Sequence, residues 1–260
     1  MKDTGGGDKV VSLKGLKVAC RACSLVQLCL PVGVSREDVE RLDAIIRRRR
    51  PLRRGEYLYR AGDRFHAVHV VRSGSVKSCA PTDEGHEQVT GFHLPGELVG
   101  LDAIHVGEHR CGAVALETTS VCEVPFGQLE TLSAQVPGLQ QQLHRLMSRE
   151  VLRDHEHLLM LGKKGAEERL ATFLVSVSNS FQERGYSPTE FRLSMSRGDI
   201  GNYLGLAVET VSRLFTRLQT LGCIEVERKL IRIADPERLR ALAGVRPCEP
   251  VAQPRHGNGS

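Results

Sequence analysis

The sequence has no tryptophan, few aromatic residues and no long apolar run. Aromatic residues make up 4% of the 260 residues. No apolar stretch approaches the roughly 20 residues that a membrane-spanning helix needs, and residues 1–15 lack the apolar core of a signal peptide. We therefore expect a cytoplasmic protein with no membrane partner.

A strong charge of either sign is also missing. The formal net charge is +5 at pH 7, with 26% charged and 40% hydrophobic residues. This charge permits a nucleic-acid partner but does not indicate one by itself. The length and the hydrophobic content suit two compact domains with terminal tails.

Residues 137–161 form the longest stretch with uniform helical character. Proline stands at its entry, glycine and proline are absent from its interior, and Gly162 follows its end. A helix of this length would span roughly 37 Å, enough to join two domains. One apolar stripe faces a core and ends in mid-helix; it comprises Leu132, Val136, Leu139, Leu143 and Leu146.

A second stripe with coiled-coil spacing occupies the other half of this helix and predicts a seam for a second copy of the chain. Its members are Met147, Val151, Asp154, Leu158 and Leu161. A parallel pair would bring Asp154 close to its own copy, and like charges removed from water repel. The helix either rotates to keep Asp154 in water or forms a deliberately weak dimer. The second interpretation makes this helix a switch.

Cysteine is clustered near the beginning of the chain. Cys20, Cys23 and Cys29 form a C-x2-C-x5-C pattern, which lets three thiolates converge on one inorganic centre. Both zinc and an iron-sulfur cluster accept such sulfurs, and the spacing does not separate the two. The fourth ligand must come from elsewhere. The bland alternative is chance proximity of small buried residues.

The region between these cysteines and the long helix changes from helix to strand. Residues 35–49 predict a short helix capped by Ser35, with the basic run 47–50 as its solvated end. Residues 52–126 predict an antiparallel β-sandwich or barrel, because short alternating segments are separated by regularly spaced glycines. The expected strands lie in residues 67–71, 75–80, 88–94 and 113–125.

The last third of the chain predicts a helix-turn-helix unit. After an amphipathic segment (residues 163–180) and an exposed loop, Ser196 and Asp199 form a capping pair, Gly205 makes a turn, and residues 207–221 form a second helix. Residues 224–235 predict a β-hairpin wing. A helical hairpin without DNA is the competing interpretation.

Polar residues at the start of the second helix favour DNA. Arg213 can donate two hydrogen bonds to guanine, Glu209 can accept from the cytosine amino group, and Ser212 can serve a base edge or a phosphate. An acidic residue on this face suits sequence reading better than phosphate binding. We also expect phosphate contacts from surface cations, namely Arg184, Arg217, Arg228 and Lys229.

Several motifs together carry a family resemblance. The runs VVRSGSVK, FHLPGELVGLDAI and ALETTSVCEVPF, with the preceding Gly55-Glu56 and Gly62-Asp63 pairs, resemble the β-roll of the cyclic-AMP receptor and FNR superfamily of bacterial regulators. The resemblance spans residues 18–243 and is strongest to the oxygen-sensing fumarate and nitrate reduction regulator and its Anr-type relatives. It implies an α+β fold with an antiparallel β-roll sensor domain, a long dimerisation helix and a C-terminal winged helix-turn-helix domain.

The resemblance also implies a cofactor and partners. Cys122 matches the family's fourth ligand to a [4Fe-4S] cluster, with Cys111 as its main competitor, and Glu209-x-x-Ser212-Arg213 matches the motif used on palindromes with TTGAT half-sites. RNA polymerase is an expected partner, with contacts around Ser73, residues 82–85, Thr118 and Arg184. Cys79, Cys111 and Cys223 are otherwise expected to be packing thiols.

The expected organisation therefore has five parts. They are a flexible N-terminus (residues 1–17), a cluster-binding segment with the β-roll (18–136), the dimerisation helix (137–161), the DNA-binding domain (163–243) and a disordered tail (244–260). We expect an oxygen-responsive transcriptional regulator and not an enzyme. It would be a homodimer when the [4Fe-4S] cluster is bound and a monomer when the cluster is lost.

Three alternatives remain at this point. A cyclic-nucleotide-responsive regulator would use the acidic residue of Gly96-Glu97-Leu98 for ribose, but the later segment around Arg110 lacks the hydroxyl residue that a phosphate cassette needs. A zinc-stabilised regulator would sense nothing through its cysteines. An iron-sulfur redox protein is disfavoured by the helix-turn-helix pattern.

Overall fold

The computed structural model describes residues 20, 23, 35–83 and 85–244 of the chain. Cys29, the predicted flexible N-terminus and the predicted tail beyond residue 244 lie outside these described residues. Within them, no helix combines the length and the apolar character that crossing a membrane requires.

An antiparallel β-roll forms the first domain, as predicted. The first residues of β8 alternate between half-buried and buried, whereas β7 is buried on both faces, and glycines with positive φ lie in several of the turns. Within the described residues the strands form two four-stranded sheets, in the orders β1-β8-β3-β6 and β2-β7-β4-β5. The strands are β1 (Arg47–Arg48), β2 (Tyr57–Tyr59), β3 (Ala67–Ser73), β4 (Val76–Pro81), β5 (Glu87–His93), β6 (Leu98–Val99), β7 (Gly112–Ala115) and β8 (Ser120–Pro125).

The basic run of residues 47–50 was predicted to be the solvated end of a helix, and this prediction was wrong. Helix α2 (Arg36–Ile45) begins at the Ser35 cap, whose hydroxyl accepts a hydrogen bond from the Asp38 N–H at 3.1 Å. Ile46 is already extended, and β1 pairs with β8. Arg48 pairs with the Asp43 carboxylate of α2, and Arg49 pairs with the buried Glu123 carboxylate of β8. These ion pairs hold the basic run between the helix and the sheet.

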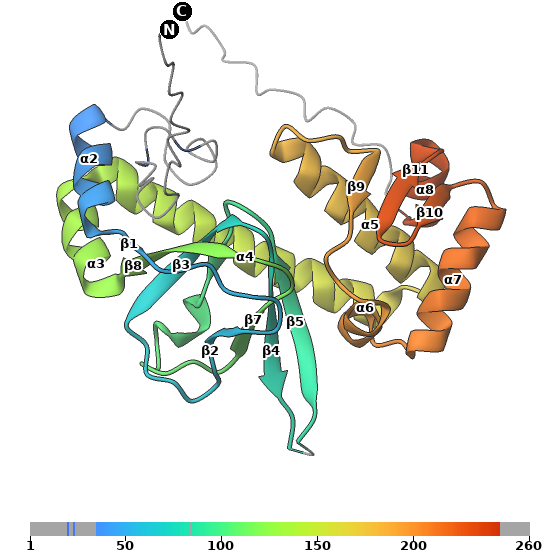
Figure 1. Ribbon diagram of the computed structural model, residues 1–260, viewed down its shortest axis with the longest axis horizontal. Coiled ribbons are helices and arrows are strands. Elements are labelled where there is room, and N and C mark those ends of the chain that lie inside the picture. Colours follow the sequence, from blue (N-terminus) through green and yellow to red (C-terminus); the bar gives the residue numbers. More distant parts are fainter. Residues whose placement is uncertain (1–19, 21–22, 24–34, 84, 245–260) are drawn as a thin grey trace, which may run out of the picture.

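Helix α4 (Pro137–Lys163) crosses the molecule from the β-roll to the C-terminal domain (Figure 1). It continues through Gly162 and ends at Lys163, whereas the predicted helix ended at Leu161. The first apolar stripe is shared between α4 and the preceding α3 (Phe126–Gln135), because the extended Val136 separates the two helices. Leu132, Val136 and Leu139 are buried in one cluster with Val68 and Val124, so the stripe faces a core as expected.

The C-terminal domain is a winged helix-turn-helix domain. The predicted wing is the hairpin of β10 (Ile224–Glu227) and β11 (Leu230–Ile233). A third strand, β9 (Glu190–Arg192), pairs with β11 where the sequence predicted an exposed loop. The helices are α5 (Ala166–Glu183), α6 (Arg197–Leu204), α7 (Val208–Thr220) and α8 (Pro236–Leu242), and the 3-10 helix η3 (Leu101–Ala103) belongs to the β-roll.

The two domains meet where α6 packs against β5, the end strand of its sheet. The Asn202 side chain imitates a strand partner: its oxygen accepts the Val89 N–H, and its amide donates to the Glu87 carbonyl at 2.8 Å. The Lys77 ammonium also pairs with Asp199 at 2.6 Å. A side-chain amide thus satisfies part of the backbone edge of β5 and fixes the docking of α6.

Replacing Asn202 with Asp removes the amide donor and places a carboxylate against the Glu87 carbonyl. We expect the free energy of unfolding to fall by about 1 kcal/mol, as for the loss of one ordinary hydrogen bond, because Asn202 is half-buried. Calorimetry measures this loss, and hydrogen exchange in residues 87–93 should quicken. Gln182→Glu, the same chemical change at an exposed position of α5, is the control. Equal stability and exchange in both variants would contradict this account.

Candidate functional sites in a cysteine pocket and a helix-turn-helix surface

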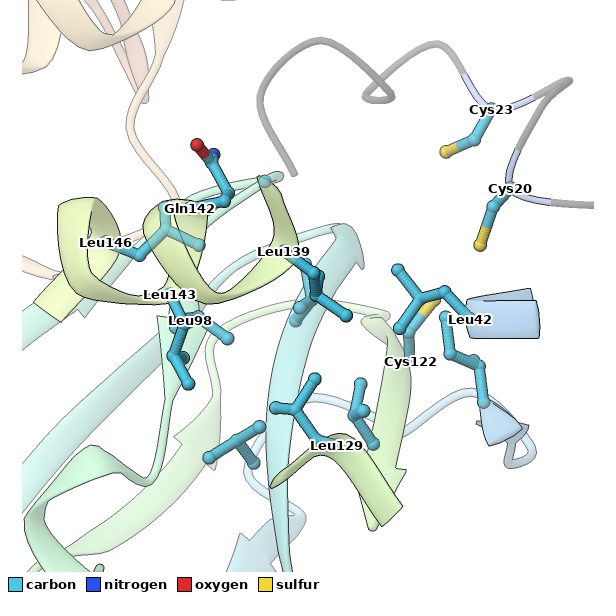
Figure 2. A pocket seen from close by; sticks show the side chains of 15 residues that line it. Cys20, Cys23, Leu42, Leu98, Cys122, Leu129, Leu139, Gln142, Leu143 and Leu146 are labelled. Atoms are coloured by element: carbon cyan, nitrogen blue, oxygen red, sulfur yellow. The ribbon is translucent and has the colours of Figure 1, made fainter. Parts of the chain in front are cut away.

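Cys20 and Cys23 line one apolar cavity of about 90 Å³ together with Cys122 from a distant part of the chain. Figure 2 shows Cys20 and Cys23 on the N-terminal segment above Cys122, with Leu42, Leu129 and Leu139 around them. The remaining lining residues are Ile46, Val68, Val70, Gly96, Leu98, Val124, Gln142, Leu143 and Leu146. Among the described residues that line this cavity there is no carboxylate or imidazole, so the donor atoms they offer are the cysteine sulfurs and the Gln142 amide.

Regular structure positions one of these cysteines, and a carboxylate anchors another. Cys122 lies in β8 opposite Val70 of β3 and Arg48 of β1. The backbone N–H of Cys20 donates to Asp43 Oδ1 at 3.0 Å, and Asp43 is in turn paired with Arg48. The Asp43 carboxylate therefore ties the cysteine segment to α2.

Burial raises the pKa of the Cys20 and Cys122 thiols, which favours their protonated form. Desolvation raises the pKa of Cys20 to about 12, and the neighbouring Asp43 carboxylate adds to this rise. Burial also raises the pKa of Cys122, although Arg48 and Arg72 counteract it. A thiolate is the species that binds a metal, so a bound centre has to displace these protons.

The donor set fits a thiolate-bound centre. Soft sulfur ligands select zinc or an iron-sulfur cluster over magnesium or calcium, and apolar walls limit access of water to such a site. Among the described residues, no group of three potential ligands already lies close enough to hold a metal. Cys29, the third cysteine of the motif, lies outside the described residues.

Cys111 lies elsewhere. It lines a larger groove of about 770 Å³ between the β-roll and α4, and its sulfur is 4.0 Å from the Thr90 hydroxyl. Cys79 and Cys223 are buried at 2% and 0% exposure, which confirms their prediction as packing thiols. Of the two candidates for a fourth ligand, only Cys122 shares a cavity with Cys20 and Cys23.

Helix α4 connects the cysteine cavity to the predicted seam. Leu139, Leu143 and Leu146 of its first half form one wall of the cavity. All five predicted seam residues line the larger groove: Met147, Val151, Asp154, Leu158 and Leu161. Val151 and Leu158 are 53% and 66% exposed, and Asp154 is exposed as well. The first half of α4 is thus packed against the core, and the seam face of its second half is open, whereas Met160 on another face of that half is buried.

Two exposed leucines beside the seam were missed from the sequence. Leu152 and Leu159 are 57% and 63% exposed and are seven residues apart, like Val151 and Leu158. Their heptad spacing was the available signal. They widen the exposed apolar face of α4 beyond the predicted seam.

Glu97 and Arg110, the two residues that a cyclic-nucleotide site would use, are engaged in other contacts. The buried Glu97 carboxylate accepts hydrogen bonds from Arg153 and Arg184, so a ribose would have to displace two guanidinium groups. The Arg110 side chain is 64% exposed and pairs with Glu108 at 3.5 Å on the surface. This arrangement disfavours cyclic nucleotide binding.

The helix-turn-helix forms as predicted. Ser196 and Asp199 exchange capping hydrogen bonds at the start of α6. Gly205 ends α6 with a φ of 64°, a left-handed conformation that favours glycine. A Cβ on Gly201 would lie 2.6 Å from the Leu206 carbonyl oxygen, so the turn approaches α6 too closely for a side chain there.

The predicted recognition face is open. Glu209, Ser212 and Arg213 of α7 are exposed, while Val211 and Phe215 are buried on the opposite face. The exposed Arg213 guanidinium donates a hydrogen bond to the Thr210 hydroxyl at 3.3 Å. Val208, 42% exposed at the start of α7, is an apolar member of this face that the sequence prediction omitted.

The predicted phosphate contacts do not share one environment. Arg184 was wrongly assigned, because its side chain is 4% exposed and bound to Glu97. The Lys229 ammonium donates to the Ser194 carbonyl, whereas Arg217 is largely exposed and pairs with Glu167. Arg228 is exposed at the tip of the wing. Burial also removes Arg184 from the expected polymerase contacts.

Comparisons with known proteins agree with this architecture. Residues 49–136 match the cyclic nucleotide-binding domain family and residues 168–242 match the Crp-like helix-turn-helix domain family. The transcriptional activator protein Anr of Pseudomonas protegens is 55% identical over 225 residues, covering 86% of this chain and 92% of Anr. The fumarate and nitrate reduction regulatory protein of Escherichia coli is 50% identical over 230 residues, covering 88% and 92%.

A solved structure supports the same fold. FixK2 from Bradyrhizobium japonicum superposes with a TM-score of 0.69 at 32% identity, covering 76% of this chain and 97% of FixK2. Both domains and the joining helix are thus accounted for by one family. The chain belongs to the Crp/Fnr family of transcriptional regulators, in the group that contains Anr and the fumarate and nitrate reduction regulatory proteins.

Proposed function

We propose that this regulator responds to oxygen through a [4Fe-4S] cluster held by Cys20, Cys23, Cys29 and Cys122. With the cluster bound, the chain dimerises through α4 and binds palindromic promoter DNA with TTGAT-type half-sites. It thereby controls anaerobic gene expression in the cytoplasm. The observation that carries this proposal is the shared cavity: three sulfurs lie on one side, and α4 forms the opposite wall.

The cavity residues link the cysteine segment to the helix. A bound cluster supplies an oxygen-sensitive centre that needs four thiolates. With a cluster bound, Cys20, Cys23 and Cys122 hold the N-terminal segment against β8, and Leu139, Leu143 and Leu146 line the same apolar space. Because these leucines belong to α4, the contents of the cavity bias the position of that helix.

The seam residues determine whether two chains associate. Val151 and Leu158 are exposed and offer apolar area to a second copy. Asp154 lies between them and opposes this association when its own copy approaches. A small change in the position of α4 is therefore sufficient to tip the balance between monomer and dimer.

The exposed face of α7 supplies sequence recognition. Arg213 donates to guanine, Glu209 accepts from cytosine, and Ser212 contacts a base edge or phosphate. Val208 offers an apolar contact to a thymine methyl group. A two-fold dimer presents two such helices to half-sites about 34 Å apart, which accounts for a palindrome.

RNA polymerase is the second macromolecular partner in this proposal. Ser73 at the end of β3 and Thr82 and Thr118 on loops of the β-roll are exposed, as a contact surface requires. Residue 84 of the predicted loop lies outside the described residues. Arg184 is not proposed as a contact.

The cofactor is tested with protein purified without air. Wild-type chain should contain iron and acid-labile sulfide in equal amounts, as a [4Fe-4S] cluster requires, and should absorb visible light. Cys122→Ser should abolish both signals, because one of the thiolates is lost. Cys111→Ser is the matched control and should retain them, since Cys111 lines the other groove.

Other outcomes of this experiment identify the alternatives. Colourless protein that contains zinc would replace the sensor with a zinc-stabilised regulator. Cluster loss in Cys111→Ser with retention in Cys122→Ser would reassign the fourth ligand.

Removing the seam carboxylate should make the dimer independent of the cluster. We expect Asp154→Ala to sediment as a dimer in air, because the like-charge repulsion is gone while Val151 and Leu158 remain. Analytical ultracentrifugation measures this. Glu156→Ala, which removes an exposed carboxylate of α4 outside the seam, should stay monomeric. A monomeric Asp154→Ala protein would refute the repulsion.

Truncating the guanine-reading residue should affect specific binding selectively. Arg213→Ala should weaken binding of the palindrome by about 1–3 kcal/mol and leave binding of unrelated duplex nearly unchanged. Fluorescence anisotropy with both duplexes measures the difference. Arg217→Ala is the comparison, since loss of a phosphate contact weakens both equally. Equal weakening by Arg213→Ala would make Arg213 a phosphate contact.

A further inference from the structure

Three parts of the molecule converge on the carboxylate of Glu97. Glu97 lies in the turn between β5 and β6 and is 8% exposed. Arg153 of α4 donates to both carboxylate oxygens at 3.1 Å, and Arg184 at the end of α5 donates to Oε1 at 2.6 Å. The β-roll, the dimerisation helix and the DNA-binding domain therefore share one buried acceptor.

Arg184 connects the DNA-binding domain to the β-roll through its hydrogen bonds. Its guanidinium also donates to the Pro95 carbonyl at 2.7 Å and to the Ser180 carbonyl of its own helix. With its side chain 4% exposed, it has no surface for a phosphate or for another protein. Its position fixes the end of α5 on the turn formed by residues 95–97.

Opposite charges stabilise the contact of Glu97 with Arg153 and Arg184, which we call the Glu97 junction. Burial by itself would raise the pKa of Glu97, but Arg153 and Arg184 together hold that pKa below its usual range. The carboxylate is therefore ionised at neutral pH. Because Arg153 and Arg184 both bind Oε1, a shift of one guanidinium changes the site available to the other.

Arg153 is the neighbour of Asp154 on α4, so it moves when the seam moves. We propose that Glu97 is a positioning residue that couples the register of α4 to the orientation of the DNA-binding domain, with Arg153 and Arg184 as its two arms. This role rests on the proposed function only in that dimerisation displaces α4. It gives Arg184 an internal role in place of a contact with DNA or polymerase.

The test compares dimerisation, DNA binding and domain docking in the full chain purified without air. Glu97→Gln retains the size of the side chain and removes its charge. We expect an unchanged dimer by ultracentrifugation, palindrome binding weakened about tenfold, and faster hydrogen exchange in residues 87–97 and 180–206. Arg184→Gln should reproduce these effects, and the double variant should be no worse than either one, since both break one junction.

Two further variants keep the result interpretable. Arg184→Lys retains the charge with a single point of contact and should give an intermediate effect. Arg240→Gln removes an exposed cation of α8 and should leave exchange at the junction unchanged. Wild-type exchange in α8 and the wing in each variant would establish that the DNA-binding domain is still folded.

Several results would overturn the inference. The first is a Glu97→Gln variant whose DNA affinity and hydrogen exchange are unchanged. The second is a loss of DNA affinity that is fully explained by loss of the dimer. The third is weaker DNA binding by Arg184→Gln when Glu97→Gln binds DNA normally. The last result would restore Arg184 as a direct contact. If wild-type protein lacks iron, the proposed function fails, but hydrogen exchange at the junction still decides the positioning role.

Discussion

Helix α4 is the element on which the rest of the molecule depends, because its first half packs in the core of the β-roll while one apolar face of its second half is exposed. Leu139 at its start is packed into the core beneath the β-roll, whereas Val151 and Leu158 are more than half exposed. An apolar face left in water favours association, so the free energy of the isolated chain is sensitive to whatever covers it.

The two ends of this helix face chemically different surroundings. At its first half the cavity is apolar and its donors are mainly sulfur, and burial there raises the pKa of the Cys20 and Cys122 thiols. A metal centre has to displace these protons to bind. At its second half the groove is wide and includes the charged Glu150, Arg153 and Asp154. A rigid helix transmits displacement between them more readily than a loop, since its backbone hydrogen bonds resist bending.

The DNA-binding domain is docked through polar contacts as well as apolar ones. Phe92 of β5 packs against Phe173 and Tyr203, while Asn202 and Lys77 supply hydrogen bonds across the same boundary. Polar contacts require particular distances and angles, so they fix orientation more sharply than apolar packing. The recognition face of α7 remains exposed in this arrangement. The contacts with β4 and β5 therefore hold the DNA-binding domain on the β-roll without covering the exposed face of α7.

The sequence by itself determined the periodic features: the β-roll, the long helix with its two stripes, and the capped helix-turn-helix with Glu209, Ser212 and Arg213 on its outer face. These depend on residues close together in the chain, whose spacing fixes which face they occupy. Tertiary structure alone decided that Arg47–Arg48 is a strand, that β9 joins the wing, and that Arg184 is buried on Glu97. It also placed Cys122 beside Cys20 and Cys111 in another groove. Such pairings join residues far apart in sequence, and burial of charge or sulfur is a property of the surroundings that the chain acquires only when it folds.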